Sequence, residues 1–138
     1  MFERWFYIST SRLEIVHAAD HVAEIVNISI PRNRSLDVTG ALMFTGQHFS
    51  QYLEGSPAAI AELKQSILQD HRHEDVRTLA AGPHEDRRFL TWSLAYAGPS
   101  RFMASKVEYA LNDALQGNVE NIGTLAEMLA GLAVEGHS

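Results

Sequence analysis

Residues 49–57 of the chain are Phe-Ser-Gln-Tyr-Leu-Glu-Gly-Ser-Pro. The first part predicts a β-strand, and Ser56-Pro57 predicts the start of a helix, with serine as N-cap and proline in the first helical position. Strand side chains alternate between two faces, so Gln51 shares a face with Phe49 and Leu53. An unpaired buried polar group costs roughly 1–3 kcal/mol. Gln51 must therefore either face solvent at an edge or meet a polar group inside.

The chain around this stretch predicts strands and helices in alternation. Besides the strand at 48–54, we expect strands at residues 2–9, 38–44, 76–81 and 91–97. A first helix follows the capping residues Thr10-Ser11 and ends near 28–29, because Pro31 disfavours helical geometry in the residue before it. A polar loop then covers residues 32–35. The second helix buries Ile60, Leu63 and Ile67, and Gly82-Pro83 ends the fourth strand.

This order of elements is typical of an α+β, ferredoxin-like β-α-β-β-α-β sheet, here with a further strand. Its crossovers place both helices on one face of the sheet. Residues 99–138 predict two amphipathic helices, the first carrying Met103 to Leu115 and the second Ile122 to Leu132 on their apolar sides. We expect two parts: a domain over residues 1–98, and an extension over 99–138 whose helices cover the second face of the sheet.

Composition excludes several classes of protein. The 138 residues are 46% hydrophobic and 20% charged, as in an ordinary single-domain soluble protein. No apolar run is long enough to cross a membrane, and the N-terminus lacks the pattern of a signal peptide. The chain has no cysteine, which excludes disulfides and thiolate metal sites. We therefore expect a cytoplasmic protein, and the net charge of −6 argues against a nucleic-acid partner.

Two histidine pairs have spacings that could hold a metal, His17 with His21 and His71 with His73. Neither pair has a third ligand at a motif spacing, so we predict no metal site. The sequence also lacks the motifs of dinucleotide, triphosphate, zinc-peptidase and serine-esterase sites. A small acylphosphatase-like enzyme using Arg32 and Asn33 remains an alternative on the same fold.

Three polar residues stand out as candidates for a binding site: Tyr7, Asn33 and Gln51. If the first and third strands are neighbours, Tyr7 and Gln51 come within hydrogen-bond reach. A phenol and two amides together suit a planar heterocycle with alternating donors and acceptors. They are also consistent with a Tyr–Gln bond in the core and an asparagine that caps a loop, and spacing alone favours this simpler interpretation.

Five motifs in order give the chain a resemblance to a known family over nearly all of its first hundred residues. They are Tyr7-Ile8-Ser9, Asn33 seven residues before Gly40 in Val38-Thr39-Gly40-Ala41-Leu42, Phe49-Ser50-Gln51-Tyr52-Leu53-Glu54-Gly55, Asp70-His71-Arg72-His73, and Arg88-Phe89-Leu90-Thr91-Trp92. The chain resembles the BLUF family of blue-light sensors that use a flavin. Each motif alone is weak, and the set in this spacing is specific.

The resemblance assigns roles to particular residues. Tyr7 matches the tyrosine that donates an electron and a proton to the excited flavin, and Gln51 matches the glutamine that bridges this tyrosine to the flavin. Asn33 matches the asparagine that pairs with a flavin carbonyl and N3–H. The remaining residues that the resemblance implies are Ser9, Asp70, Arg72 and His73 for the cofactor, of which Arg72 lies near the ribityl and phosphate end, and Trp92 for the photoreaction.

The function that the resemblance implies is a photoreceptor rather than an enzyme. The cofactor expected is FAD, although FMN or riboflavin could also bind. Light would change the hydrogen bonds of Gln51, and the change would pass through the C-terminal helices to a downstream effector protein or to a homo-oligomer. Leu94 stands where many family members have methionine. The resemblance therefore does not define how the signal passes through the fifth strand. A colourless regulatory binding module is the second alternative.

Overall fold

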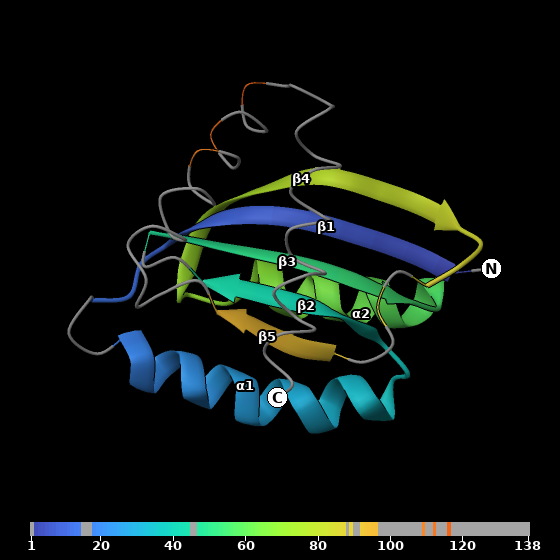
Figure 1. Cartoon of the computed structure of the whole chain (residues 1–138), viewed down its shortest axis with the longest axis horizontal. Helices are drawn as coiled ribbons and strands as arrows, with labels where there is room; N and C mark the ends of the chain where they lie inside the picture. The colour runs from blue at the N-terminus through green and yellow to red at the C-terminus, as the bar shows by residue number, and fades with distance from the viewer. Residues whose placement is uncertain are drawn as a thin grey trace.

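The computed structural model describes residues 2–14, 18–44, 47–87, 89, 92–96, 109, 112 and 116. These residues form one five-stranded sheet and two helices (Figure 1). The elements are β1 (Phe2–Ser11), α1 (Ala18–Ser35), β2 (Thr39–Phe44), β3 (His48–Gly55), α2 (Pro57–Leu68), β4 (His73–His84) and β5 (Trp92–Tyr96). No helix of this described part is both long and apolar enough to cross a membrane.

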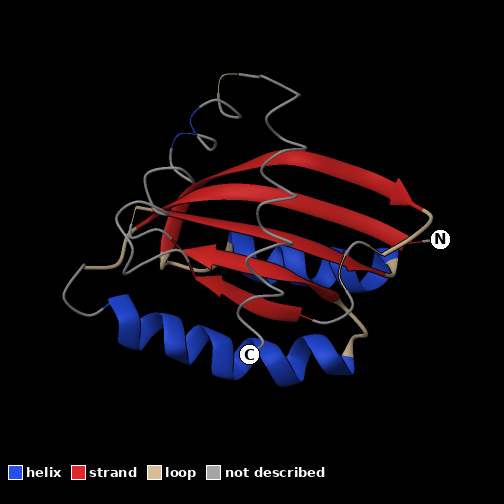
Figure 2. Ribbon diagram, viewed as in Figure 1, coloured by secondary structure: helices blue, strands red, loops and turns tan. Residues whose placement is uncertain are grey.

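The strands lie side by side in the order β4-β1-β3-β2-β5 (Figure 2). β1, β3, β2 and β4 pair antiparallel, and β5 adds to β2 as a parallel edge strand. This is the ferredoxin-like α+β fold, with the additional strand, that the sequence predicts. The adjacency of the first and third strands is confirmed too.

One row of residues crosses the whole sheet through Gln51. Its successive backbone partners, from the β4 edge to the β5 edge, are Thr78, Tyr7, Gln51, Leu42 and Leu94. Directly opposed residues of neighbouring strands point to the same face of a sheet. The register therefore places the Tyr7 and Gln51 side chains next to each other.

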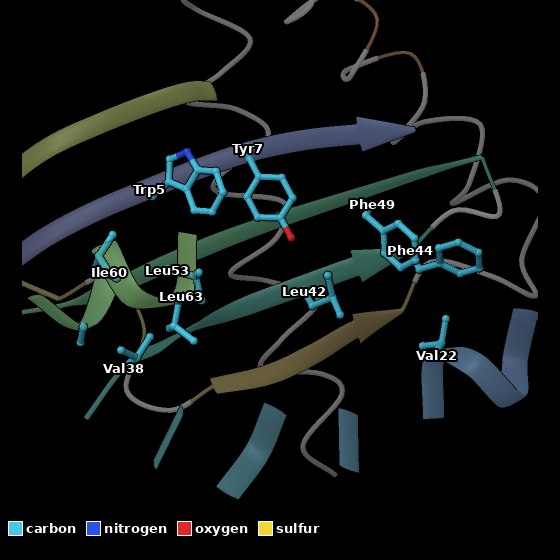
Figure 3. Close-up of a cluster of buried hydrophobic side chains, with 11 residues drawn as sticks. Trp5, Tyr7, Val22, Val38, Leu42, Phe44, Phe49, Leu53, Ile60 and Leu63 are labelled. Carbon is cyan, nitrogen blue, oxygen red and sulfur yellow. The ribbon is translucent and has the colours of Figure 1, made fainter. Parts of the chain in front are cut away.

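Both helices pack on the face that carries Tyr7. One buried cluster joins strand residues of this face to side chains of α1 and α2 (Figure 3), and its members are Trp5, Tyr7, Val22, Val38, Leu42, Phe44, Phe49, Leu53, Ala59, Ile60 and Leu63. The other face is equally inaccessible, with Phe6, Ile8, Met43 and Tyr52 buried. The sheet therefore has two apolar faces, of which α1 and α2 cover one.

Helix α2 begins as the sequence predicts. Pro57 is its first residue, and the hydroxyl of Ser56 accepts a hydrogen bond of 3.2 Å from the backbone N–H of Ala59. Ile60 and Leu63 face the core. The predicted turn from strand to helix at residues 55–57 is thus confirmed.

Helix α1 corrects the prediction that it stops near residue 29. It continues through Pro31 to Ser35, so Asn33 lies in its last turn and not in a loop. Pro31 removes only one backbone hydrogen bond, and the preference against helix in the preceding residue is weak enough for tertiary packing to override. Hydrogen bonds from the Leu36 and Val38 N–H groups to the carbonyls of Arg32 and Asn33 close the helix end.

Two strands were also predicted too short, β1 at its end and β4 at both ends. Thr10 and Ser11 continue β1, pairing with β3 and β4, and do not cap a helix. β4 runs from His73 past Gly82 and Pro83 to His84. It is an edge strand, and proline is tolerated there because its missing N–H can lie on the unpaired side. The other predicted strand ends agree with the structure to within one residue.

The predicted C-terminal helices lie almost wholly outside the described residues, as does the boundary at 98–99. Within the part that is described, Tyr109 and Asn112 are helical, and the N–H of Gln116 donates to the carbonyl of Asn112 at 3.2 Å.

Candidate functional site

A cleft opens between α1, α2 and the central strands. It contains about 740 Å³ of empty space, counted out to and including its mouth, and is lined by Tyr7, Ile25, Ile28, Ser29, Arg32, Asn33, Leu42, Phe49, Gln51, Leu53, Leu63, Ser66, Ile67, Asp70, Arg72 and His73. Of the seven predicted cofactor residues, six line this cleft. Ser9 does not.

Tyr7 and Gln51 form a buried hydrogen bond in the floor of the cleft. The Tyr7 hydroxyl donates to Gln51 Oε1 at 2.8 Å, and both residues are almost fully buried. Burial, with a smaller contribution from the charge of Asp70, raises the pKa of the Tyr7 hydroxyl far above its ordinary value. Tyr7 therefore remains a protonated donor at any physiological pH.

The other side-chain polar atoms of Gln51 and Asn33 have no partner within the described part of the chain. Once Gln51 Oε1 accepts from Tyr7, its NH₂ group is left to donate, and the side-chain amide of Asn33 makes no hydrogen bond to a described residue. Gln51 is 6% exposed and Asn33 only 2%. Buried amides are nearly always satisfied. Two that face one cleft without partners indicate a ligand with matching donors and acceptors.

The walls of the cleft between these amides are apolar. α1 contributes Ile25 and Ile28, and α2 contributes Leu63 and Ile67. Leu42 and Leu53 lie in the strand floor and are buried. A site with aliphatic walls and a few polar groups is typical of pockets for largely apolar, flat cofactors.

Asp70 and Arg72 form an ion pair at the edge of the cleft. Arg72 Nε and Nη2 donate to the carboxylate oxygens of Asp70 at 2.9 and 2.7 Å, and the Arg72 backbone N–H donates to it as well at 2.9 Å. Burial alone would raise the pKa of the Asp70 carboxyl, but the hydrogen bonds from Arg72 outweigh it and lower that pKa. The same bonds raise the pKa of Arg72.

His73 links three elements beneath the cleft. Its Nε2 lies 2.7 Å from the carbonyl oxygen of Ile67, which can only accept, so Nε2 carries a proton. Its Nδ1 lies 2.6 Å from the Ser9 hydroxyl, and its ring packs edge-on against Tyr7 and Phe49. Both ring nitrogens of His73 thus bond to protein, and Ser9 supports the site through His73.

Arg32 lines the cleft, although the only role predicted for it was in the enzyme alternative. Its Nη1 donates to the hydroxyl of Ser66 at 2.9 Å, which joins α1 to α2 across the cleft. No carboxylate within the described residues pairs with it. Arg32 therefore brings an unneutralised positive charge to the site, whereas Arg72 is neutralised by Asp70.

The last two predictions concern Trp92 and the histidines. Trp92 begins β5, where its backbone pairs with Gly40, and its side chain lies outside what the structure describes. His71 is exposed and His73 is bonded as above, and His17 lies outside the described residues. Within the described part, no group of three residues could hold a metal ion.

Comparison with known proteins decides the family. The model of the family described as "Sensors of blue-light using FAD" matches residues 2–95, most of the chain and all of the sheet up to β5. This chain belongs to the BLUF family. The match confirms the resemblance that the sequence motifs indicated.

Individual relatives and solved structures support the same family. The blue light- and temperature-regulated antirepressor BluF of Escherichia coli is 40% identical over 68 residues, 49% of this chain and 17% of that protein. The dark-state structure of the BLUF protein BlrB superposes with a TM-score of 0.80 at 27% identity, covering 94% of this chain and 96% of BlrB. BlrP1 of Klebsiella pneumoniae, solved with FMN and cyclic diGMP, has a TM-score of 0.65 at 28% identity and covers 84% of this chain and 30% of BlrP1. The chain spans less than a fifth of the curated relative.

The donors, acceptors and flat ring of a flavin match the residues that line the cleft. The pyrimidine edge of an isoalloxazine ring carries carbonyl acceptors and an N–H donor, which match the two unpartnered amides of Asn33 and Gln51. Its flat aromatic body matches the aliphatic walls from α1 and α2. The family is one of blue-light sensors that use FAD, and the residues present suit that cofactor.

Proposed function

We propose that this BLUF chain is a blue-light switch in which Tyr7 releases an electron and a proton and Gln51 changes its hydrogen bonds. The observation that carries the proposal is the buried 2.8 Å bond from Tyr7 to Gln51 Oε1, which leaves the Gln51 NH₂ group to donate into the cleft. A bound flavin supplies light absorption and an oxidising excited state. Every other step belongs to the side chains.

In the switch, Tyr7 gives up an electron and releases its hydroxyl proton along the bond to Gln51. When electron and proton return, the Gln51 amide has rotated or tautomerised and offers the cleft a different set of donors and acceptors. A stronger bond to the cofactor carbonyl lowers the excited state relative to the ground state and shifts absorption to the red. Two hydrogen-bonding arrangements of one amide provide the two states that a switch requires.

The other cleft residues bind rather than switch. Asn33 pairs with the ring edge, Arg32 supplies a positive charge for the more polar part of the cofactor, and Arg72, although paired with Asp70, offers N–H donors to it. We propose FAD as the natural cofactor and FMN as a substitute, which the FMN-containing structure of the relative BlrP1 supports. Riboflavin should bind through the same ring contacts.

Output passes from Gln51 to another protein. The row of backbone partners from Gln51 through Leu42 to Leu94 in β5 offers a direct path across the sheet. We propose that residues 99–138 pack on the second face of the sheet and relay the change to an effector or to a second copy of the chain. The antirepressor activity named for the E. coli relative supports a protein partner. We further propose a cytoplasmic, non-enzymatic sensor.

Light-induced absorption tests the proposal. The purified protein should be yellow and should shift reversibly to longer wavelength under blue light, recovering in the dark. A colourless protein that hydrolyses acyl phosphates would instead support the enzyme alternative on this fold.

A further inference from the structure

Trp5 is in direct contact with the proposed electron donor. It lies two residues before Tyr7 on the same face of β1, and the two rings stack with centroids 4.5 Å apart and planes inclined by 30°. Both residues are almost inaccessible. Figure 3 shows the rings side by side, with the Tyr7 hydroxyl directed away from Trp5. An indole is about as easily oxidised as a phenol, so two potential donors lie in contact beside one cleft.

The two rings differ in what happens to their protons. Tyr7 donates to Gln51 Oε1 and can release its proton with the electron, which leaves a neutral ring. Trp5 Nε1 donates to the Thr78 hydroxyl at 2.9 Å. That hydroxyl is not a base at neutral pH. Trp5 can therefore lose an electron only as a cation that keeps its N–H.

Lys64 places a positive charge beside the Trp5 ring, and it is not one of the residues that line the cleft. Its Nζ lies 5.3 Å from the centre of the Trp5 ring, and it follows the cleft residue Leu63 on α2. The ammonium attracts the neutral ring, as in other cation–π pairs. It repels the same ring once an electron has left. Oxidation of Tyr7 ends in a neutral ring, so the same charge opposes it far less.

We propose that Trp5 is a second potential electron donor, and that the charge of Lys64 disfavours its oxidation, so that Tyr7 is oxidised instead. This inference rests on the proposed function, in which the light-excited flavin is the one-electron oxidant. Without the Lys64 charge, Trp5 gives an electron to that oxidant and takes the same electron back. No bond forms or breaks and no proton moves. The Gln51 amide therefore keeps its arrangement, and no red-shifted state forms.

The experiment compares Lys64→Gln, Lys64→Arg and the double variant Trp5→Phe/Lys64→Gln with the unchanged holoprotein. Lys64 is exposed, so its replacement leaves the fold intact. Transient absorption and electron paramagnetic resonance identify the radical formed after a blue flash, and the yield of the red-shifted state is measured in parallel. Glu62→Gln, an exposed charge change on the same helix, is the matched control.

We expect Lys64→Gln to form an indole radical cation and to lose red-shift yield by about two- to fivefold, the range over which a screened charge alters a competition of rates. Lys64→Arg and Glu62→Gln should behave like the unchanged protein, and Trp5→Phe/Lys64→Gln should recover the yield. An unchanged radical and yield in Lys64→Gln, or an indole signal that survives in the double variant, would overturn the proposal. If the unchanged protein itself gave no red shift, the proposed function would fail instead.

Discussion

Gln51 is placed by the register of two strands and given its orientation by one hydroxyl. The direct pairing with Tyr7 brings the amide to a buried donor, and Tyr7 stays protonated because burial raises its pKa. The geometry therefore fixes which end of the amide faces the cleft. From the sequence, Tyr7, Gln51 and Asn33 could be selected as polar residues out of place, but not shown to share a cavity.

Removing the amide should separate binding from switching. In Gln51→Leu, we expect the protein to remain yellow, because Asn33 and the apolar walls still hold the ring, and to lose the red shift. Absorption spectra before and after blue light make the measurement, with the exposed Gln65→Leu as the control. A normal shift in Gln51→Leu would remove Gln51 from the mechanism.

Asn33 should contribute affinity rather than switching. Loss of its hydrogen bonds in Asn33→Ala should weaken flavin binding roughly tenfold, as expected for about 1.5 kcal/mol. Quenching of flavin fluorescence on titration of the flavin-free protein gives the dissociation constant. Asn27→Ala, on an exposed position of the same helix, should bind as the unchanged protein does. Equal affinities in the two variants would place the ligand away from Asn33.

At the scale of elements, the sequence predicted which helices and strands exist better than where they end. Alternation and caps identified all five strands and the start of α2. The end of α1 was predicted too early because Pro31 was taken to stop the helix. Packing of the helix on the sheet instead lets it continue through Pro31 to Ser35. Positions 25, 28, 29 and 32 recur at helical spacing across Pro31, and all four line the cleft. That periodicity was the signal that could have added Arg32 to the site.

The β2–β3 pairing depends on a glycine at position 40. Gly40 has φ +150°, and an added Cβ would meet the backbone oxygen of Tyr52. We expect Gly40→Ala to lower the free energy of unfolding by about 3 kcal/mol or more, from backbone strain and overpacking together. Chemical denaturation measures it.

Gly82 provides the matched control for that substitution. It also has a positive φ, +123°, but a Cβ there would meet nothing within 4 Å. Gly82→Ala should therefore cost only the strain, about 1 kcal/mol. Equal losses in the two variants would mean that contact with Tyr52 is not what requires glycine at position 40.

At the scale of the whole molecule, the Asp70–Arg72 pair makes stability depend on acidity. The pKa of Asp70 is lower in the folded protein than in the unfolded chain, so the pair stabilises the fold at pH values above about 4. This contribution is lost as pH falls through the folded pKa. We expect Asp70→Asn to melt at a lower temperature at pH 7, with the difference closing towards pH 2. A difference that stayed constant with pH would contradict the ion pair as its cause.

We propose that one buried amide, Gln51, turns the absorption of light into a change of hydrogen bonding. The most direct test is the difference spectrum of the purified protein between blue light and dark. We predict a small shift of the flavin bands to the red that reverses in the dark without net reduction of the flavin. Bleaching of those bands, or a spectrum that does not change, would contradict the claim.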